Sequence, residues 1–141
     1  MIKAAFPGSF DPPTLGHLDI VERASALFDE LVLFVADNHG KHCLFSPEER
    51  VRLLSALAAG LPNVQVRRCS TLVTDAMRAE GIGVLVRGIR GERDFSFEFD
   101  MARWNRLLAP EIETVVLFPR APFEIVSSSA VRELLSFGKD V

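Results

Sequence analysis

Cysteine is scarce in this chain of 141 residues, which holds only Cys43 and Cys69. Their separation fits neither a metal-binding cluster nor a redox pair. Unpaired thiols are typical of a reducing compartment, where disulfides rarely persist. We therefore expect both side chains to be buried or chemically idle.

Long hydrophobic runs and an excess of positive charge are also lacking. No apolar segment approaches membrane-spanning length, and no charged leader precedes an apolar stretch. The formal net charge is -3, whereas proteins that bind nucleic acid broadly tend to be basic. The sequence thus predicts a cytoplasmic protein with no membrane and no nucleic-acid partner.

Two familiar phosphate-binding signatures are absent as well. The chain contains neither the dinucleotide fingerprint G-x-G-x-x-G nor the phosphate-loop signature G-x-x-x-x-G-K-S/T. It also offers no activated Ser-His pair and no reactive cysteine setting, so a covalent nucleophile is not expected. A nucleotide would have to be bound by another kind of loop.

What the chain does contain is an alternation of short apolar runs and helix-period segments, with 48% hydrophobic and 25% charged residues. This composition and length predict one globular domain spanning residues 1–141. The apolar runs predict strands at Ile2–Phe6, Leu31–Val35, Val64–Arg67, Val84–Val86 and Thr114–Phe118.

A helical segment is expected after each strand. In the first, one stripe should be buried, formed by Ile20, Ala24, Leu27 and Phe28. The second opens at Ser46 with the capping string S-P-E-E, and the others are expected at about 71–80, 94–108 and 127–137. Five such units predict an α/β fold, a Rossmann-like doubly wound domain whose five-stranded parallel sheet is flanked by helices.

The string P-G-S-F-D-P-P-T-L-G-H, from Pro7 to His17, joins the first strand to the first helix. Open α/β sheets bind ligands at the carboxyl ends of their strands, and a helix start offers free N–H groups to a phosphate. Ser9 supplies a hydroxyl, Gly16 permits close approach to the backbone, and His17 falls in the first helical turn. A lone Gly-His is most often only a turn, but the whole string directly after a strand predicts a nucleotide site.

Three further segments carry groups that suit phosphate. Arg87 and Arg90, in V-R-G-I-R after the fourth strand, form a solvated turn or, opposite the first loop, supply an arginine ligand. The run Ser127–Ser129 opens the fifth helix, either as a plain cap or as a phosphate site. Lys41, after the second strand, is a solvated lysine or a cation that reaches an incoming phosphate.

Two other features allow more than one interpretation. His39 and His42 have no third ligand at a suitable spacing, so we expect no metal site. The aromatics of the fourth helix are expected to be core or a subunit contact rather than an adenine slot, and Trp104 is expected to pack. These aromatics are Phe95, Phe97 and Phe99.

Together the motifs resemble the bacterial phosphopantetheine adenylyltransferases, a family of the nucleotidyltransferase superfamily with a T/H-x-G-H motif. The resemblance runs along nearly the whole chain: G-S-F-D-P-P-T-L-G-H, Asn38 with Lys41, F-S-P-E-E-R, V-R-G-I-R, D-F-S-F-E-F-D-M-A-R-W-N-R and I-V-S-S-S-A-V-R-E. It implies an enzyme of coenzyme A biosynthesis that joins ATP to 4'-phosphopantetheine, giving dephospho-coenzyme A and pyrophosphate. The implied Mg²⁺ is carried by the ATP phosphates without dedicated protein ligands. The implied partners also include coenzyme A, and the implied assembly is a homohexamer.

The resemblance implies a role for each matching residue. The catalytic set would be His17, Ser9, Lys41 and Arg90. The ATP-binding set would be Ser9, Phe10, His17, Gly88, Arg90, Glu98, Phe123, Ser127, Ser128 and Ser129, with Phe10, Gly88, Glu98 and Phe123 bordering the adenosine. The acceptor phosphate would be held by Ser9, Lys41 and Arg87, and the pantetheine arm by Leu72, Val73 and Asn105.

Some positions depart from the family pattern. Ser9 stands where threonine is commoner, Phe97 replaces a frequent tyrosine, and Val73 replaces a frequent methionine or leucine. The chain ends at Val141, where the family usually continues by about one helix, so the end is either truncated or naturally short.

The implied mechanism is direct in-line attack of the acceptor phosphate on the α-phosphorus of ATP, without a general base. Rival activities are a sister adenylyltransferase acting on nicotinate mononucleotide and a cytidylyltransferase using CTP. The blocks V-R-G-I-R and D-F-x-F-E argue against both. A rival of another class is an idle module that senses ATP or coenzyme A, and the complete cation set Lys41, Arg87 and Arg90 argues against it.

Overall fold

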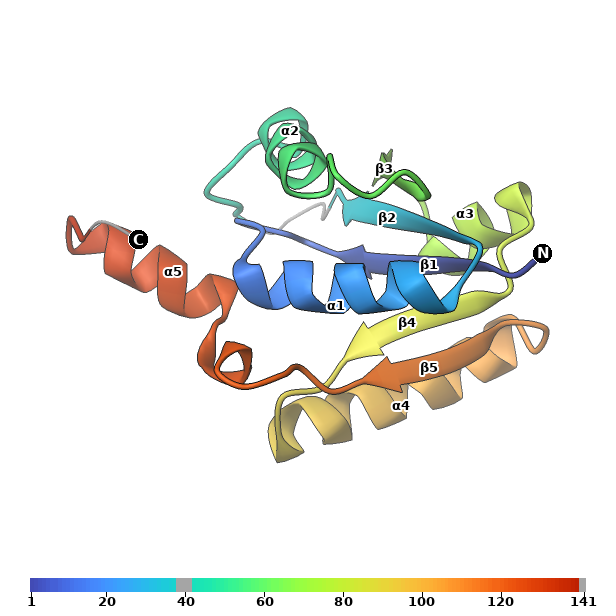
Figure 1. Ribbon diagram of the computed structural model, residues 1–141. Coiled ribbons are helices and arrows are strands. Elements are labelled where there is room, and N and C mark those ends of the chain that lie inside the picture. Colours follow the sequence, from blue (N-terminus) through green and yellow to red (C-terminus); the bar gives the residue numbers. More distant parts are fainter. Residues whose placement is uncertain (38–41, 140–141) are drawn as a thin grey trace.

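The computed structural model describes residues 1–37 and 42–139, in which strands and helices alternate (Figure 1). The strands are β1 Lys3–Gly8, β2 Glu30–Ala36, β3 Val64–Cys69, β4 Val84–Gly88 and β5 Glu113–Leu117. The helices are α1 Leu15–Leu27, α2 Pro47–Leu57, α3 Val73–Glu80, α4 Glu92–Leu108 and α5 Ser128–Ser136, with a 3-10 turn η1 at Phe123–Ile125.

The strands form one parallel sheet in the order β3-β2-β1-β4-β5. From β1 the chain adds β2 and then β3 on one side of the sheet. It then crosses back and adds β4 and β5 on the other side of β1. The direction in which strands are added therefore reverses between β1 and β4. Helices α1 and α2 cover one face of the sheet, and α3 and α4 cover the other (Figure 1). The expected α/β doubly wound class is confirmed, with small shifts at the ends of the predicted strands.

Two apolar layers hold the sheet between its helices. Successive side chains of a strand point to opposite faces, so the buried runs of β1 and β2 supply both layers. The layer under α1 and α2 includes Ala4, Phe6, Leu31, Leu33 and Val35. The layer under α3 and α4 includes Ala5, Val32, Phe34, Cys69 and Leu85.

The start of α2 follows the expected capping pattern. Ser46 Oγ accepts a hydrogen bond from the Glu49 N–H at 3.1 Å, and the Glu49 carboxylate accepts one from the Ser46 N–H at 3.1 Å. Pro47 occupies the first turn, where its missing N–H costs nothing. The helix therefore begins at the predicted residue.

Several predictions about burial are wrong. Leu27 was expected in the buried stripe of α1 but is 62% exposed, because the helix ends there and Phe28 packs against the core instead. Trp104, which was expected to pack, is 61% exposed. The phenylalanines of α4 are all more than half exposed, so of their two expected alternatives they are not core, and the subunit contact stays a prediction. Only Glu98 of α4 is buried, because the helix covers the sheet edge with its other side facing outward.

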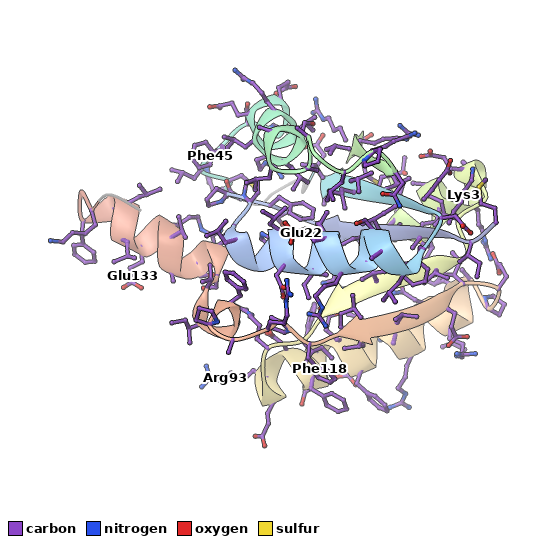
Figure 2. The ribbon with its side chains drawn as sticks, viewed as in Figure 1. Lys3, Glu22, Phe45, Arg93, Phe118 and Glu133 are labelled. Carbon is purple, nitrogen blue, oxygen red and sulfur yellow. The ribbon has the colours of Figure 1, made fainter. Side chains whose placement is uncertain are left out.

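Helix α5 leaves the body of the domain and has no buried residue (Figure 1). Its first turn touches the loop after β1, while its later turns point away, and Glu133 is exposed there (Figure 2). None of the helices in the described ranges combines the length and apolar character needed to cross a bilayer. Cys43 and Cys69 are both free, as expected.

Candidate functional site

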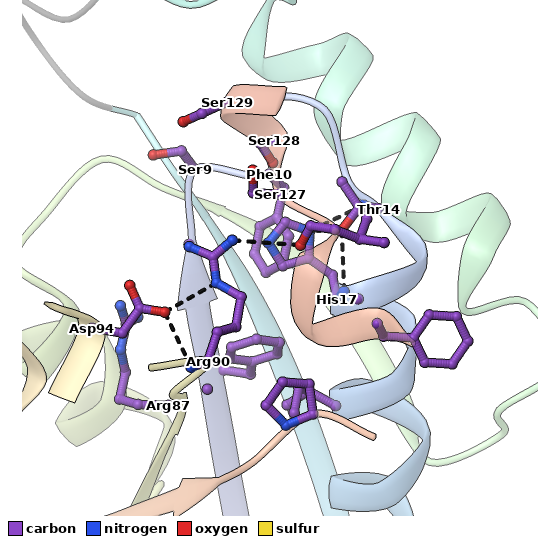
Figure 3. Close-up of a pocket in the computed structure, with 18 of the residues that line it drawn as sticks. Ser9, Phe10, Thr14, His17, Arg87, Arg90, Asp94, Ser127, Ser128 and Ser129 are labelled. Atoms are coloured by element: carbon purple, nitrogen blue, oxygen red, sulfur yellow. Dashed lines mark hydrogen bonds and ion pairs between the residues drawn. The ribbon is translucent and has the colours of Figure 1, made fainter. Parts of the chain in front are cut away.

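A cavity of about 370 Å³ opens at the carboxyl ends of β1 and β4, the strands between which the sheet order reverses. Ligands of open α/β sheets bind at this kind of switch point. The walls come from the β1–α1 loop, the first turn of α1, the end of β4, α4 and the segment from Pro119 to the start of α5 (Figure 3). The predicted site residues that line the cavity are Ser9, Phe10, His17, Arg87, Gly88, Arg90, Glu98, Phe123, Ser127, Ser128 and Ser129.

His17 is held by the residue that caps its own helix. The Thr14 N–H donates to His17 Nδ1 at 3.0 Å, and the His17 N–H donates to Thr14 Oγ1 at 3.3 Å (Figure 3). This reciprocal pair is a capping box with histidine in place of the usual glutamate. Because the backbone N–H can only donate, Nδ1 must accept, and the proton of a neutral imidazole then sits on Nε2.

The imidazole of His17 stays neutral over the physiological range. Its burial, followed by the positive charges of Arg90 and Arg87, lowers its pKa from 6.5 to about 4. The Phe10 ring packs edge-on against it, with ring centroids 4.8 Å apart. The result is a fixed, uncharged hydrogen-bond donor at the start of a helix.

Gly8 makes room for a neighbouring ring, and Gly16 lies close to the segment before α5. A Cβ on Gly8 would come within 3.1 Å of the Phe10 ring, so the turn after β1 depends on the missing side chain. A Cβ on Gly16 would lie 3.4 Å from the carbonyl oxygens of Phe123 and Val126. This is an ordinary van der Waals distance, so the segment before α5 lies close to Gly16 without requiring a glycine there.

Arg87 enters the cavity from the end of β4 with its guanidinium already engaged. Its Nε and Nη2 donate to the two oxygens of Glu98, each at 2.7 Å, and Nη1 donates to the Pro7 carbonyl at 2.8 Å. Glu98 is only 7% exposed, so this is a largely buried bidentate pair. Glu98 lines the cavity as predicted, but its carboxylate holds Arg87 in place.

Arg90 is oriented by Asp94, one helical turn further on. The Asp94 carboxylate accepts from Arg90 Nε at 3.0 Å and from the Arg90 N–H at 3.1 Å (Figure 3). Burial alone would raise the pKa of Asp94, but the hydrogen bonds from Arg90 outweigh it and the pKa falls below its usual value. Arg90 Nη1 also reaches the Val126 carbonyl, which joins β4 to the segment before α5.

The start of α5 forms the opposite wall. Ser127 caps the helix through the Ala130 N–H at 3.1 Å, and Ser128 Oγ donates to the Pro12 carbonyl at 2.7 Å. The cap interpretation of the serine run is confirmed for Ser127, and the phosphate site stays a prediction, with the helix start lining the cavity. The amino ends of α1 and α5 meet here, and each favours an anion.

Sequence reasoning missed Arg132, Asp94 and Asp11 as lining residues. Arg132 Nη1 donates to the Asp11 carbonyl at 2.6 Å, and its Nη2 donates to Ser129 Oγ at 3.1 Å. Its position one turn after the serines, on the same helix face, was the signal that could have found it.

Not every predicted site residue reaches this cavity. Leu72, Val73 and Asn105 do not line it: Leu72 is 52% exposed before α3, Val73 packs against the core, and Asn105 lies in α4. Lys41, Asn38 and His39 lie outside the described residues. In the described ranges, no three histidine, cysteine, aspartate or glutamate side chains gather as a metal site would require.

Residues 5–134 match the family model described as cytidylyltransferase-like. The sheet, the site at its switch point and this match define a nucleotidyltransferase. Proteins named phosphopantetheine adenylyltransferase are similar over nearly the whole chain. That of Methylococcus capsulatus is 46% identical, covering 99% of this chain and 86% of its own. That of Herpetosiphon aurantiacus is 49% identical, covering 100% and 86%, and that of Clostridium tetani is 45% identical, covering 96% and 84%. The chain belongs to the phosphopantetheine adenylyltransferase family, which confirms the resemblance and the expected enzyme class.

Solved structures of other activities share the fold. A Vibrio parahaemolyticus protein assigned as a nicotinate-nucleotide adenylyltransferase has a TM-score of 0.72 and 25% identity, covering 99% of this chain and 84% of its own. A lipopolysaccharide core biosynthesis protein from Thermoplasma volcanium has a TM-score of 0.57 and 21% identity, covering 85% and 97%. The second likeness concerns the fold alone.

Proposed function

We propose that this chain transfers the adenylyl group of ATP to 4'-phosphopantetheine, giving dephospho-coenzyme A and pyrophosphate in coenzyme A biosynthesis. The family supports adenylyl transfer to this acceptor. The single observation that carries the proposal is the neutral His17, whose Nε2 proton is directed by the capping box in a cavity lined by three arginines and two helix starts. Such a cavity suits a polyphosphate.

Different walls of the cavity would bind different parts of the two substrates. The β- and γ-phosphates would bind Arg90 and the serines at the start of α5, where N–H groups and the helix dipole favour anions. The adenosine would lie near Phe10, Gly88, Glu98 and Phe123. The acceptor phosphate would bind Ser9, Lys41 and Arg87, with the pantetheine arm toward Leu72, Val73 and Asn105.

His17 would act by donating a hydrogen bond. Nδ1 already accepts from Thr14, and Nε2 carries the proton, so neither nitrogen is poised to take a proton from the acceptor. A phosphate monoester is ionised near neutral pH and needs no base. The substrate phosphate would attack the α-phosphorus in line, while Nε2–H bonds an α-phosphate oxygen and stabilises the charge that builds there.

Magnesium fits this scheme as part of the MgATP substrate. Three acidic residues line the cavity. Asp94 and Glu98 are paired with Arg90 and Arg87, and the Asp11 carboxylate already accepts from the backbone N–H groups of Leu44 and Phe45. The ion would therefore be carried by the ATP phosphates, and it would supply positive charge to the leaving pyrophosphate.

Association into a homohexamer is also part of the proposal. The exposed apolar residues of α4 support contact between copies, because large apolar patches on a free surface are unfavourable. They are Phe95, Phe97, Phe99, Met101, Trp104 and Leu107. Light scattering would give six times the 15.6 kDa chain mass for a hexamer. The two free cysteines support a cytoplasmic location.

The first test is pyrophosphate release with MgATP and 4'-phosphopantetheine, beside nicotinate mononucleotide as the competing acceptor. The rival acceptor is included because the Vibrio parahaemolyticus protein shares the fold. Release with 4'-phosphopantetheine alone is the expected result. Release only with nicotinate mononucleotide would transfer the assignment to the sister activity. ATP binding without release to either acceptor would favour a nucleotide sensor.

A further inference from the structure

Arg50 is a buried cation that the proposed chemistry does not use. It lies near the start of α2, and only 2% of the residue is exposed. None of the ion pairs found among residues 1–37 and 42–139 includes it. A buried charge must exchange its hydration for strong hydrogen bonds. The partners of Arg50 therefore show what it is positioned to hold.

Its partners are backbone carbonyls of two neighbouring loops. Nη1 donates to the Ser9 carbonyl at 2.7 Å and to the Ala36 carbonyl at 2.9 Å, and Nε donates to the Phe45 carbonyl at 3.1 Å. Ser9 follows β1, and Ala36 ends the adjacent β2. Phe45 lies just before α2 (Figure 2). One guanidinium thus spans the carboxyl ends of the two strands beside the cavity.

The Ser9 carbonyl precedes a strained residue. Phe10 has a φ of 50°, a left-handed conformation that is unfavourable for a bulky side chain. Such a conformation persists only where its surroundings hold it. The Phe10 ring is held between Phe6 and His17, with centroids 5.6 and 4.8 Å away. Arg50 holds the other side, and because the peptide is planar and trans, fixing the Ser9 C=O also fixes the Phe10 N–H in the opposite direction.

A second set of hydrogen bonds, made by Asp11, holds the same loop. The buried Asp11 carboxylate accepts from the Leu44 N–H at 2.8 Å and from the Phe45 N–H at 2.9 Å. The turn from Ser9 to Asp11 is therefore anchored at both ends to the segment that leads into α2.

We propose that Arg50 is a positioning residue of the nucleotide site. By binding the Ser9 carbonyl it fixes the plane of the Ser9–Phe10 peptide, which keeps Phe10 in its left-handed conformation and places Ser9 and Phe10 correctly relative to His17. Its kinetic readout rests on the proposed adenylyl transfer. Arg50 touches no substrate in this arrangement and acts only through the loop.

The test compares Arg50→Lys and Arg50→Met with Arg52→Met, which removes an exposed arginine from the same helix. We expect Arg50→Lys to fold and to lose about 10- to 100-fold in kcat, because small displacements of a reacting geometry cost rate in that range. KM for each substrate should change less than about threefold, since the substrate-binding groups remain. Arg50→Met should lose more, and Arg52→Met should match the wild type.

A spectroscopic readout separates this inference from the proposed function. Displacement of the Phe10 ring alters the ring-current shift on the His17 imidazole protons, so Arg50→Lys should move these NMR resonances while Arg52→Met leaves them in place. A wild-type enzyme without activity would refute the proposed function but leave this measurement decisive. Any of three results would overturn the positioning role. The His17 resonances could stay in place in Arg50→Lys, or its kcat could equal that of the wild type. The third is a loss of activity no larger than the loss of folded protein measured by circular dichroism. A lysine variant that does not fold would do the same, because the residue would then serve general stability.

Discussion

The neutral state of His17 predicts a particular loss of stability in acid. The pKa of the imidazole is lowered from 6.5 to about 4 by burial and by Arg90 and Arg87. Above pH 6.5 the group is neutral in both the folded and the unfolded chain and contributes no pH dependence. Between pH 6.5 and about pH 4 the unfolded chain binds the proton and the folded chain does not, so the free energy of unfolding falls as the pH falls.

The magnitude follows from the two pKa values. One unit corresponds to about 1.4 kcal/mol, so at pH 5.0 the contribution reaches about 2 kcal/mol, and below pH 4 it levels off near about 3 kcal/mol. The variant His17→Gln removes the titration while keeping a polar side chain of moderate size. Wild type should therefore lose about 2 kcal/mol more than the variant between pH 7.5 and pH 5.0.

The assay is urea unfolding of the free protein at several pH values, with an NMR titration of the imidazole as a direct check. His42→Gln, which removes an exposed histidine outside the cavity, sets the background for losing a histidine. Equal pH dependence in wild type and His17→Gln would refute the reasoning. His17 would then titrate near its ordinary pKa, and the argument for a fixed neutral donor would fail.

Four other substitutions, one of them a control on an exposed ion pair, test the site and its supports. His17→Ala should keep the fold and ATP binding but lower kcat about 10²–10³-fold, the loss typical of one donor to developing charge; unchanged turnover in the pyrophosphate assay would contradict the assignment. Glu98→Gln should lower the free energy of unfolding by about 2–3 kcal/mol, because it leaves the guanidinium of Arg87 without its buried partner. Glu113→Gln, in an exposed pair, should cost less than about 1 kcal/mol in the same urea experiment, and equal costs would mean that burial does not matter here. Asp19→Asn should cost about 1–2 kcal/mol by calorimetry, since hydrogen bonds from two arginines converge on that buried carboxylate; a neutral effect would show that these bonds do not hold the segment before α5.

The sequence predicted the cavity walls well because each wall is a local motif. The string from Pro7 to His17 is continuous, and its capping residue and its histidine are three positions apart, so the helix brings them together without help from the rest of the chain. Ser127 and Ser46 likewise act on the turn that follows them. Parallel strands then bring these local motifs to the same edge of the sheet.

Pairings between distant segments could not be read in the same way. Glu98 looked like a residue beside the adenosine, but the crossing of α4 over β4 turns its carboxylate onto Arg87. Arg50 appeared only as the last residue of the F-S-P-E-E-R block, yet it is buried between three carbonyls. Leu27 was expected inside and Trp104 was expected to pack, but no element within residues 1–37 and 42–139 covers either position.

The sequence by itself determined the order of strands and helices, the parallel sheet and the loops that suit phosphate, because periodicity, capping and turn chemistry are properties of neighbouring residues. The tertiary structure alone decided which charges are paired, which aromatic side chains remain outside and which state His17 adopts. These outcomes depend on burial and on fields from residues far apart in the chain. Burial in the folded domain, followed by the charges of Arg90 and Arg87, keeps the imidazole neutral by lowering its pKa, and only the folded sheet brings these arginines, seventy or more residues further along, beside it.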